Sequence, residues 1–261
     1  MDLAEAMLRR IALVLLFCLA TNDAFGAVAF RSGFGSTYAS RTNNVLTAPA
    51  GIQNGDILII CFLIFNGSSS PPTPTPPAGF VVVPGPTFPV NGGTSSLHVH
   101  NFIWFKVASS ESGNYTVTHT VATSQAWIGA YSGGNQSTPM VPNATSNTGT
   151  GTTTTALGLT TTINGSGIIF VAQDFGDNNN NLTAPSGTTP TFTKEFGATV
   201  GNGSGGILFI ADGALSPAGS TGNKTFTSNS NSTSPWAGFL VTIAASPPAN
   251  CGRLALLGVG C

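Results

Sequence analysis

Histidine and carboxylate side chains are the groups of this chain that could perform acid–base or metal chemistry. His98 and His100 lie two positions apart, so on a β-strand they would share one face. That geometry can bind a metal ion if His119 approaches from a neighbouring strand; the alternative is a pair of exposed polar residues on a solvent face. The carboxylates downstream of residue 26 show no spacing that places one as the acid and another as the base of a hydrolase. They are Asp56, Glu111, Asp174, Asp177, Glu195 and Asp212.

Two further motifs have the composition of ligand-binding loops but lack the residue spacing or the flanking helix that such loops need. The run from Asp174 to Asn181 could offer oxygens to Ca²⁺, yet its spacing matches no calcium loop, which favours a polar hairpin tip. Gly201 to Gly206 fits G-x-G-x-x-G, but a strand follows where a dinucleotide site needs a helix. The chain has no serine in a nucleophile elbow followed by the Asp and His of a catalytic triad. Asp56 is expected to cap its own turn. We therefore predict a protein without enzymatic activity, cofactor or metal.

The elements that would position these side chains are β-strands. Ile57 to Phe65 is an unbroken apolar run that follows the polar turn at 54–56. A run this short, bounded by turn residues and rich in Ile and Phe, is typical of a buried strand. Further strands are expected at 97–107, 115–121 and 126–131, and no helical periodicity appears after the N-terminal segment.

The second half of the chain repeats this plan. Ile168 to Ala172 matches the first apolar strand, and landmarks recur at a nearly constant offset: 185 − 77 = 108 positions between Pro77 and Pro185, and 236 − 127 = 109 between Trp127 and Trp236. Two sets of half-apolar strands bury their faces most simply by packing against each other. We therefore predict an all-β fold, a two-sheet jelly-roll-like β-sandwich at 27–246, built from sequence-similar halves at about 27–133 and 156–246.

Composition excludes one class of partner. Charged residues make up 7% of the chain and the net charge is −1. No basic surface is available to neutralise phosphates, so we expect no nucleic-acid binding. With so few charges, solubility must come from hydroxyls, amides or attached sugars.

The first residues predict export. Arg9 and Arg10 precede a short apolar run, Ile11 to Ala20, which is the pattern of a secretory signal peptide. We predict a signal peptide at 1–26, with cleavage after Gly26 or Ala29, and no membrane span in the rest of the chain. The small residues that define the cleavage region are Ala24, Gly26, Ala27 and Ala29.

The four cysteines have different expected roles. Cys18 lies in the signal peptide, and a lipoprotein cysteine is disfavoured there because the preceding residue is not small. Cys61 lies within the buried strand, where a free thiol behaves as a small hydrophobe. Cys251 and Cys261 bracket the C-terminal tail, 247–261, and are expected to close a small disulfide loop; a bond to another subunit is the alternative.

The segment from Val28 to Ser40 has two interpretations. It is either an edge strand of its own domain or an arm that adds to the sheet of a neighbouring subunit, since strand addition needs only main-chain hydrogen bonds and a few apolar side chains. In the second case Val28, Phe30 and Phe34 would be those apolar side chains.

Asn-X-Ser/Thr sequons are frequent, and most fall in predicted loops, where an acceptor would be accessible. They predict a glycosylated surface protein; the alternative is the loop composition of a protein from an organism without the transferase. The sequons begin at Asn66, Asn114, Asn135, Asn143, Asn164, Asn181, Asn202, Asn223 and Asn231.

The order of several motifs resembles a repeated β-sandwich module of phage tail and appendage proteins and of secreted bacterial surface proteins. The resemblance covers nearly the whole chain after the signal peptide and implies a fold and an extracellular setting, with no catalytic residue. Phe80 stands where the module more often has Trp. The motifs are G-D-I-L-I from Gly55, T-P-P-A-G-F ending at Phe80, W-F-K-V-A from Trp104, Y-T-V-T from Tyr115 and A-W-I-G-A-Y ending at Tyr131.

These observations favour a secreted, non-enzymatic structural subunit of an extracellular assembly at a cell or virion surface, such as a fibre, a matrix layer or a phage-type appendage. Its partners would be copies of itself, joined by N-terminal strand addition. The alternative is a carbohydrate-binding or adhesion module with glycans as partners, because sandwiches of this kind often hold sugars against exposed aromatic rings. The aromatic residues for that role would be Tyr131, Phe88, Trp104 and Phe175.

Overall fold

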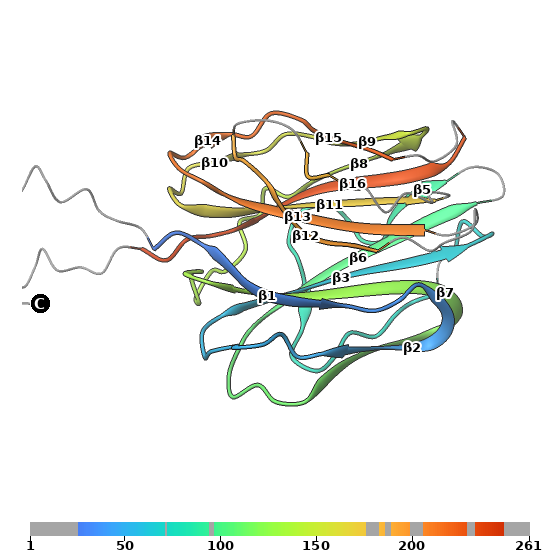
Figure 1. Ribbon diagram of the computed structural model, residues 1–261, viewed down its shortest axis with the longest axis horizontal. Coiled ribbons are helices and arrows are strands. Elements are labelled where there is room, and N and C mark those ends of the chain that lie inside the picture. The colour runs from blue at the N-terminus through green and yellow to red at the C-terminus, as the bar shows by residue number, and fades with distance from the viewer. Residues whose placement is uncertain are drawn as a thin grey trace, which may run out of the picture.

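The computed structural model describes residues 26–70, 72–93, 97–175, 183–185, 189–198, 206–228 and 233–247. Every helix or strand found in these ranges is a β-strand, so the predicted all-β fold is confirmed. Within the described residues, no helix has the length and apolar character needed to cross a membrane. Figure 1 shows two stacked layers of strands, with β16, β11 and β13 above β3, β7 and β1.

The first sheet contains seven antiparallel strands. Its order is β1-β7-β3-β6-β4, with β2 also paired to β7 and β5 also paired to β6. The central strand is β3, the apolar run expected from the sequence, and it pairs along its length with β6 and β7. The strands are β1 (Ala29–Gly35), β2 (Ala39–Thr47), β3 (Ile57–Asn66), β4 (Val81–Val82), β5 (Val90–Gly93), β6 (His98–Val107) and β7 (Asn114–Ser132).

The second sheet contains five strands in the order β12-β13-β11-β16-β8. Two short ribbons, β9 with β15 and β10 with β14, accompany it. The strands are β8 (Thr145–Thr150), β9 (Thr153–Ala156), β10 (Thr160–Thr161), β11 (Ser166–Phe175), β12 (Thr193–Ala198), β13 (Gly206–Leu215), β14 (Gly219–Ser220), β15 (Lys224–Thr227) and β16 (Pro235–Ile243).

The described strands of each sheet come from one half of the chain. The chain therefore passes between the two sheets once, after β7, rather than alternating between them as in a jelly roll. The order β1-β7-β3-β6 in the first sheet corresponds to β8-β16-β11-β13 in the second. A duplicated module would produce this correspondence; that the halves are copies of one module stays a prediction.

Apolar side chains form three layers. A central cluster lies between the sheets, where Ile59 and Leu63 of β3 belong with Val171 of β11 and Phe239 of β16. The other face of β3 and the other face of β11 each have a cluster of their own, covered by flanking strands and loops. Residues 57–65 are all buried, which explains why the run is apolar without alternation: both faces of the strand are covered.

Both described chain ends lie at one end of the sandwich. Gly26 forms a β-bridge with Ser246, and Gly134 forms one with Ala245. Figure 1 shows these segments on the left, next to the start of β3. The opposite end, where β3 and β11 finish, is therefore the far end of the sandwich from Gly26 and Ser246.

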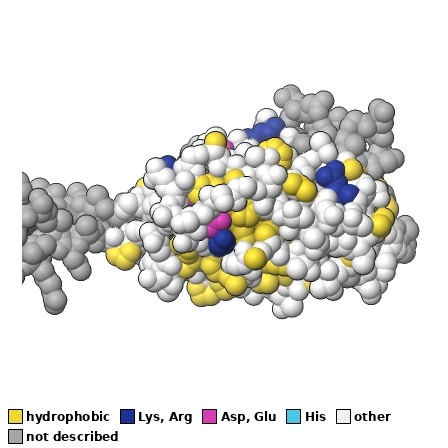
Figure 2. Space-filling model, turned by 90° about the horizontal axis from the view of Figure 1, so that it is seen from below, with side chains coloured by type: hydrophobic (Ala, Val, Ile, Leu, Met, Phe, Trp, Pro, Cys, Tyr) yellow, Lys and Arg dark blue, Asp and Glu magenta, His cyan; other side chains and the backbone are white. Residues whose placement is uncertain are grey.

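Charged side chains are sparse on the surface. Figure 2 shows the face below the first sheet, where most of the area is uncharged polar or hydrophobic. The ion pairs among the described residues include Arg31 with Asp56, at 2.8 Å, and Lys106 with Glu111, at 2.7 Å. Asp56 also accepts the backbone N–H of Gln53 at 2.8 Å, so it caps its turn as expected.

Candidate functional site

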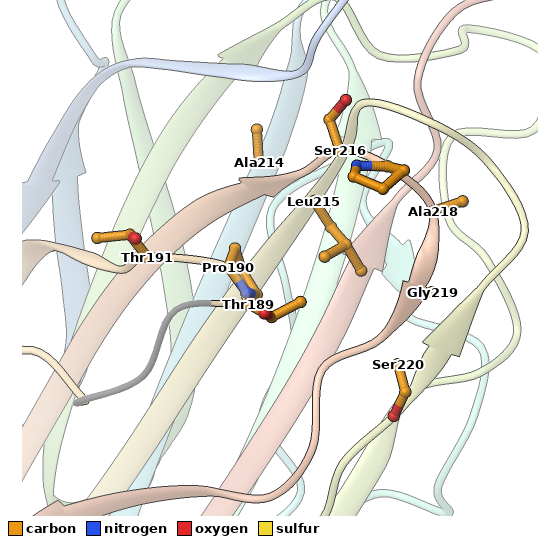
Figure 3. A pocket seen from close by; sticks show the side chains of 10 residues that line it. Thr189, Pro190, Thr191, Ala214, Leu215, Ser216, Ala218, Gly219 and Ser220 are labelled. Carbon is orange, nitrogen blue, oxygen red and sulfur yellow. The ribbon is translucent and has the colours of Figure 1, made fainter.

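Two of the recesses among the described residues differ in their chemistry. The larger, of about 610 Å³, lies between the turn at 189–191 and the segment 214–220, as Figure 3 shows. Its lining provides hydroxyls, prolines and aliphatic carbons but no aromatic ring and no ionisable group, which gives it little means of fixing a ligand. The lining residues are Thr189, Pro190, Thr191, Ala214, Leu215, Ser216, Pro217, Ala218, Gly219 and Ser220.

The smaller recess, of about 250 Å³, has the mixed lining expected of a binding site. It lies where β3 and β11 end and β6 begins. We call it the aromatic recess, because three rings contribute to it together with an amide, an imidazole and a hydroxyl. Its lining residues are Tyr38, Phe65, Asn66, Gly67, Leu97, His98, Thr123 and Phe175.

The rings meet because the two central strands end at the same place. Phe65 is the last apolar residue of β3, Phe175 is the last residue of β11, and their ring centroids are 5.3 Å apart. Tyr38, in the connection from β1 to β2, packs edge-on against Phe65 with centroids 5.3 Å apart. The N–H of Gly206 donates to the Tyr38 hydroxyl, and a β-carbon on Gly206 would overlap the Phe65 ring. Burial raises the pKa of Tyr38 above its ordinary value, so the hydroxyl stays neutral.

A histidine behind the recess orients its polar rim. The His100 ring stacks on His98 with centroids 5.9 Å apart. Its Nε2 lies 2.8 Å from Oδ1 of Asn66, and its Nδ1 lies 2.7 Å from Oδ1 of Asn91. Burial lowers the pKa of His100 below its ordinary value. The amide of Asn66 is therefore held in place from behind, while none of the lining residues is a carboxylate, lysine or arginine.

The histidine metal site that the sequence left as an option does not assemble among the described residues. Both ring nitrogens of His100 face asparagine oxygens, and His119 belongs to a separate network on β7. No group of three or more His, Cys, Asp or Glu in the described part of the chain is arranged to hold a metal ion.

That separate network contains a Ser–His pair that the sequence did not indicate. Ser124 Oγ lies 3.1 Å from His119 Nε2, and His119 Nδ1 lies 2.7 Å from the carbonyl oxygen of Thr120. Asn44 donates to Ser124 at 2.8 Å. Although this resembles a nucleophile with its base, Ser124 and Asn44 are completely buried, so no substrate can reach them. The network satisfies polar groups where β2 shifts register against β7.

The structure also brings together two carboxylic acids that the sequence did not pair. Asp212 of β13 and Glu195 of β12 are hydrogen-bonded to each other, next to the bulge between Lys194 and Phe196. Burial, reinforced by the neighbouring Glu195, raises the pKa of Asp212 to about 8. No spacing rule predicted this contact, because the two residues meet only when their strands pair.

The aromatic residues expected to bind sugar fall into different environments. Tyr131 and Trp104 are buried in apolar clusters and cannot stack on a ligand. Phe88 is half-buried and packs on Phe239 with centroids 6.0 Å apart. Only Phe175 of the four lines the aromatic recess. Tyr38 and Phe65 were missed; the position of Phe65 at the exact end of an apolar strand was the available signal.

The N-terminal residues expected to mediate assembly belong to the sandwich of their own chain in this structure. β1 pairs with β7, Val28 is buried in the central cluster, and Phe30 packs on Tyr131 with centroids 5.4 Å apart. Phe34 is 39% exposed. Strand addition between subunits stays a prediction.

The sequons differ in accessibility. Asn114 and Asn223 are exposed, whereas the amide nitrogen of Asn143 donates to the carbonyl of Thr160 at 2.7 Å and that of Asn66 donates to Ser70 at 3.4 Å. Asn135 and Asn164 are half-buried. Several earlier candidates lie outside the described residues: Asn181, Asn202, Asn231, Asp177, Cys251 and Cys261.

Comparisons with protein-family models, with curated proteins and with solved structures find no match to this chain.

Proposed function

We propose that this chain is a secreted β-sandwich module that binds a neutral carbohydrate in the aromatic recess and acts in adhesion rather than in catalysis. The observation that supports this most directly is the meeting of Tyr38, Phe65 and Phe175 at one opening. Tyr38 and Phe175 are half-buried and can offer apolar faces to the C–H faces of a sugar, while the buried Phe65 packs against both rings. The adjacent polar groups can bond the hydroxyls of the sugar.

The polar rim and the size of the recess limit the kinds of ligand that it could bind. Asn66, His98 and Thr123 offer donors and acceptors, and the lining contains no carboxylate, lysine or arginine to recognise an acidic or basic substituent. A volume of about 250 Å³ is below the usual range for drug-sized ligands, which fits one sugar ring rather than an extended chain.

The position of the recess suits adhesion. β3 begins at Ile57, next to the bridged chain ends, and finishes at Asn66 on the rim of the recess. At about 3.3 Å per residue, the strand separates the two by roughly 30 Å. An attachment through either chain end would therefore leave the recess facing away from it.

A glycan array followed by calorimetric titration tests the proposal. The chain without residues 1–26 should bind at least one neutral saccharide, and Phe175→Ala should weaken that binding at least about tenfold, which corresponds to about 1.4 kcal/mol. Phe34→Ala is the matched control, because Phe34 is an exposed aromatic residue outside the recess. Binding to no saccharide, or equal effects of the two variants, would contradict the proposal.

A second candidate, a structural subunit of an extracellular assembly, is supported by one edge of the first sheet. β4 ends that sheet, and its two residues, Val81 and Val82, are each 54% exposed. Edge strands with apolar side chains are templates for pairing with another chain, whereas bulges and charges block it. The edge strands β1 and β12 have such bulges, next to Arg31 and Glu195 respectively. Pairing through β4 would join copies of the chain.

Negative-stain microscopy of the chain without residues 1–26 tests this second candidate. We expect filaments or layers that Val82→Lys abolishes without unfolding the chain, while Val121→Lys, at a 73% exposed valine on β7, leaves them intact. Dispersed monomers at high protein concentration would exclude assembly through this edge.

A further inference from the structure

The three rings of the aromatic recess are inclined to one another rather than coplanar. The ring of Tyr38 makes an angle of 72° with that of Phe65, and the ring of Phe175 makes an angle of 54° with it. Phe65 is buried, whereas Tyr38 and Phe175 are half-buried, so Phe65 closes the base of the recess and the other two rings form its apolar sides. Either side can contact the C–H face of a sugar, but the corner that the rings enclose suits a compact apolar group such as a methyl.

The hydrogen bonds around Asn66 fix the orientation of its side-chain amide on the rim. Nε2 of His100 lies 2.8 Å from Oδ1 of Asn66 and 3.0 Å from the carbonyl oxygen of Ser68. Because a carbonyl oxygen can only accept, Nε2 carries the hydrogen and the amide turns its oxygen towards the ring. The backbone N–H of Ser68 also donates to Oδ1, at 3.2 Å. One N–H of the amide is directed to the carbonyl of Ser70 at 3.4 Å, so what Asn66 has left for a ligand is an N–H donor.

We infer that the sugar bound in the aromatic recess carries an acetamido group. The carbonyl oxygen of that group accepts the remaining N–H of Asn66, and its methyl group lies in the corner between Tyr38 and Phe175. A hydroxyl at the same position of the sugar could accept from Asn66 but would leave the corner unfilled. An acetamido group is uncharged, which agrees with a lining that has no carboxylate, lysine or arginine. This inference rests on the proposed binding of a neutral saccharide and names the class of that saccharide.

Calorimetric titration with matched pairs of sugars tests the inference. The pairs are N-acetylglucosamine with glucose, N-acetylgalactosamine with galactose, and N-acetylmannosamine with mannose, and the members of each differ only in an acetamido group that replaces one hydroxyl. The chain without residues 1–26 is made in a bacterium that lacks the oligosaccharide transferase, so that Asn66 carries no glycan. It should bind the acetylated member of at least one pair at least about tenfold more tightly, through one buried methyl group and one hydrogen bond.

The outcomes of this titration separate the inference from the proposed function. Equal binding within every pair, or binding confined to sugars without an acetamido group, would overturn the inference and leave the proposed function intact. Binding of no saccharide would overturn both. Saturation-transfer NMR on the same chain then locates the methyl group: its hydrogens should receive more saturation than any ring hydrogen of the sugar, because they contact Tyr38 and Phe175. A methyl group that receives no more than the ring hydrogens would contradict its placement in the corner.

Asn66→Asp tests the hydrogen-bond donor separately. The aspartate keeps an oxygen for His100 and Ser68 but replaces the N–H groups by a second oxygen, which would face the carbonyl of the ligand. Binding of the acetylated sugar should therefore weaken at least about tenfold. Asn114→Asp is the matched control, because it adds the same charge at an exposed asparagine outside the recess. Equal affinities of the two variants would show that Asn66 does not recognise the carbonyl; if Asn66→Asp fails to fold, the sugar pairs decide alone.

Discussion

Gln125 links the two sheets through the interior, and replacing it tests the packing on which the whole fold depends. The side chain is completely buried on β7 of the first sheet. Its Oε1 accepts the backbone N–H of Leu208, on β13 of the second sheet, at 3.0 Å. Its Nε2 donates to the carbonyl oxygen of Ser36 at 3.3 Å. Gln125→Met keeps the volume and removes both hydrogen bonds.

The expected loss follows from the two groups left without a partner. A buried donor or acceptor that loses its partner costs about 1–3 kcal/mol, and the apolar methionine side chain recovers part of that cost. We therefore expect Gln125→Met to lower the free energy of unfolding by about 3 kcal/mol. For a domain of this size, about 2–4 °C is lost per kcal/mol, so the thermal midpoint should fall by about 6–12 °C.

Urea unfolding followed by tryptophan fluorescence, together with a thermal scan, measures this loss. Gln136→Met is the matched control, because Gln136 is exposed in the connection after β7 and should tolerate the change within about 0.5 kcal/mol. If Gln125→Met were as stable as the control, Gln125 would not be a buried link and the two sheets would not face each other as described.

Three further predictions concern buried ionisable groups. Burial lowers the pKa of His119 and of His100, so below about pH 6.5 the folded state binds fewer protons than the unfolded state. The urea concentration at the unfolding midpoint should therefore be constant above about pH 6.5 and fall as the pH drops below it. Equal midpoints at about pH 7.5 and about pH 5 would contradict this. Burial is the main reason that the pKa of Asp212 is raised to about 8, so the contribution of Asp212 to stability declines as the pH rises from about 4 to 8. Asp212→Asn should make the urea midpoint depend less on pH over this range. The same pH dependence in the variant and the original chain would refute the prediction. Burial raises the pKa of the Cys61 thiol, so peptide mapping should find Cys61 unlabelled by thiol reagents in the native chain and labelled in urea; native labelling would show that β3 is open.

Local pattern was enough to locate the principal strands. The nine apolar residues at 57–65 form most of β3, and Ile168 to Ala172 lie within β11, because a short apolar run between turn residues can be buried only as a strand covered on both faces. The Asp56 cap was predictable for the same reason, since its partner Gln53 is three residues away. Low charge and absent helical periodicity completed the all-β prediction.

The residues of the aromatic recess could be predicted only in part from local sequence patterns. Phe175 was among the aromatic residues considered for sugar binding, but Tyr131 and Trp104 were grouped with it although both are buried. An aromatic residue in a strand has the same local sequence signal whether it faces a core or an opening. The side on which it lies depends on what packs over it.

What the sequence determined by itself is the position of the main apolar strands and of several turns, because these depend on residues that are neighbours along the chain. It did not show that 115–121 and 126–131 belong to one strand, β7. Tertiary structure alone decided which of their side chains meet. Asn44 reaches His119 across 75 positions, Gln125 reaches Leu208 across 83, and Asp212 reaches Glu195 only through the register of two strands. A register shift of one residue would turn each of these side chains to the opposite face, and no short pattern in the chain records which register is adopted.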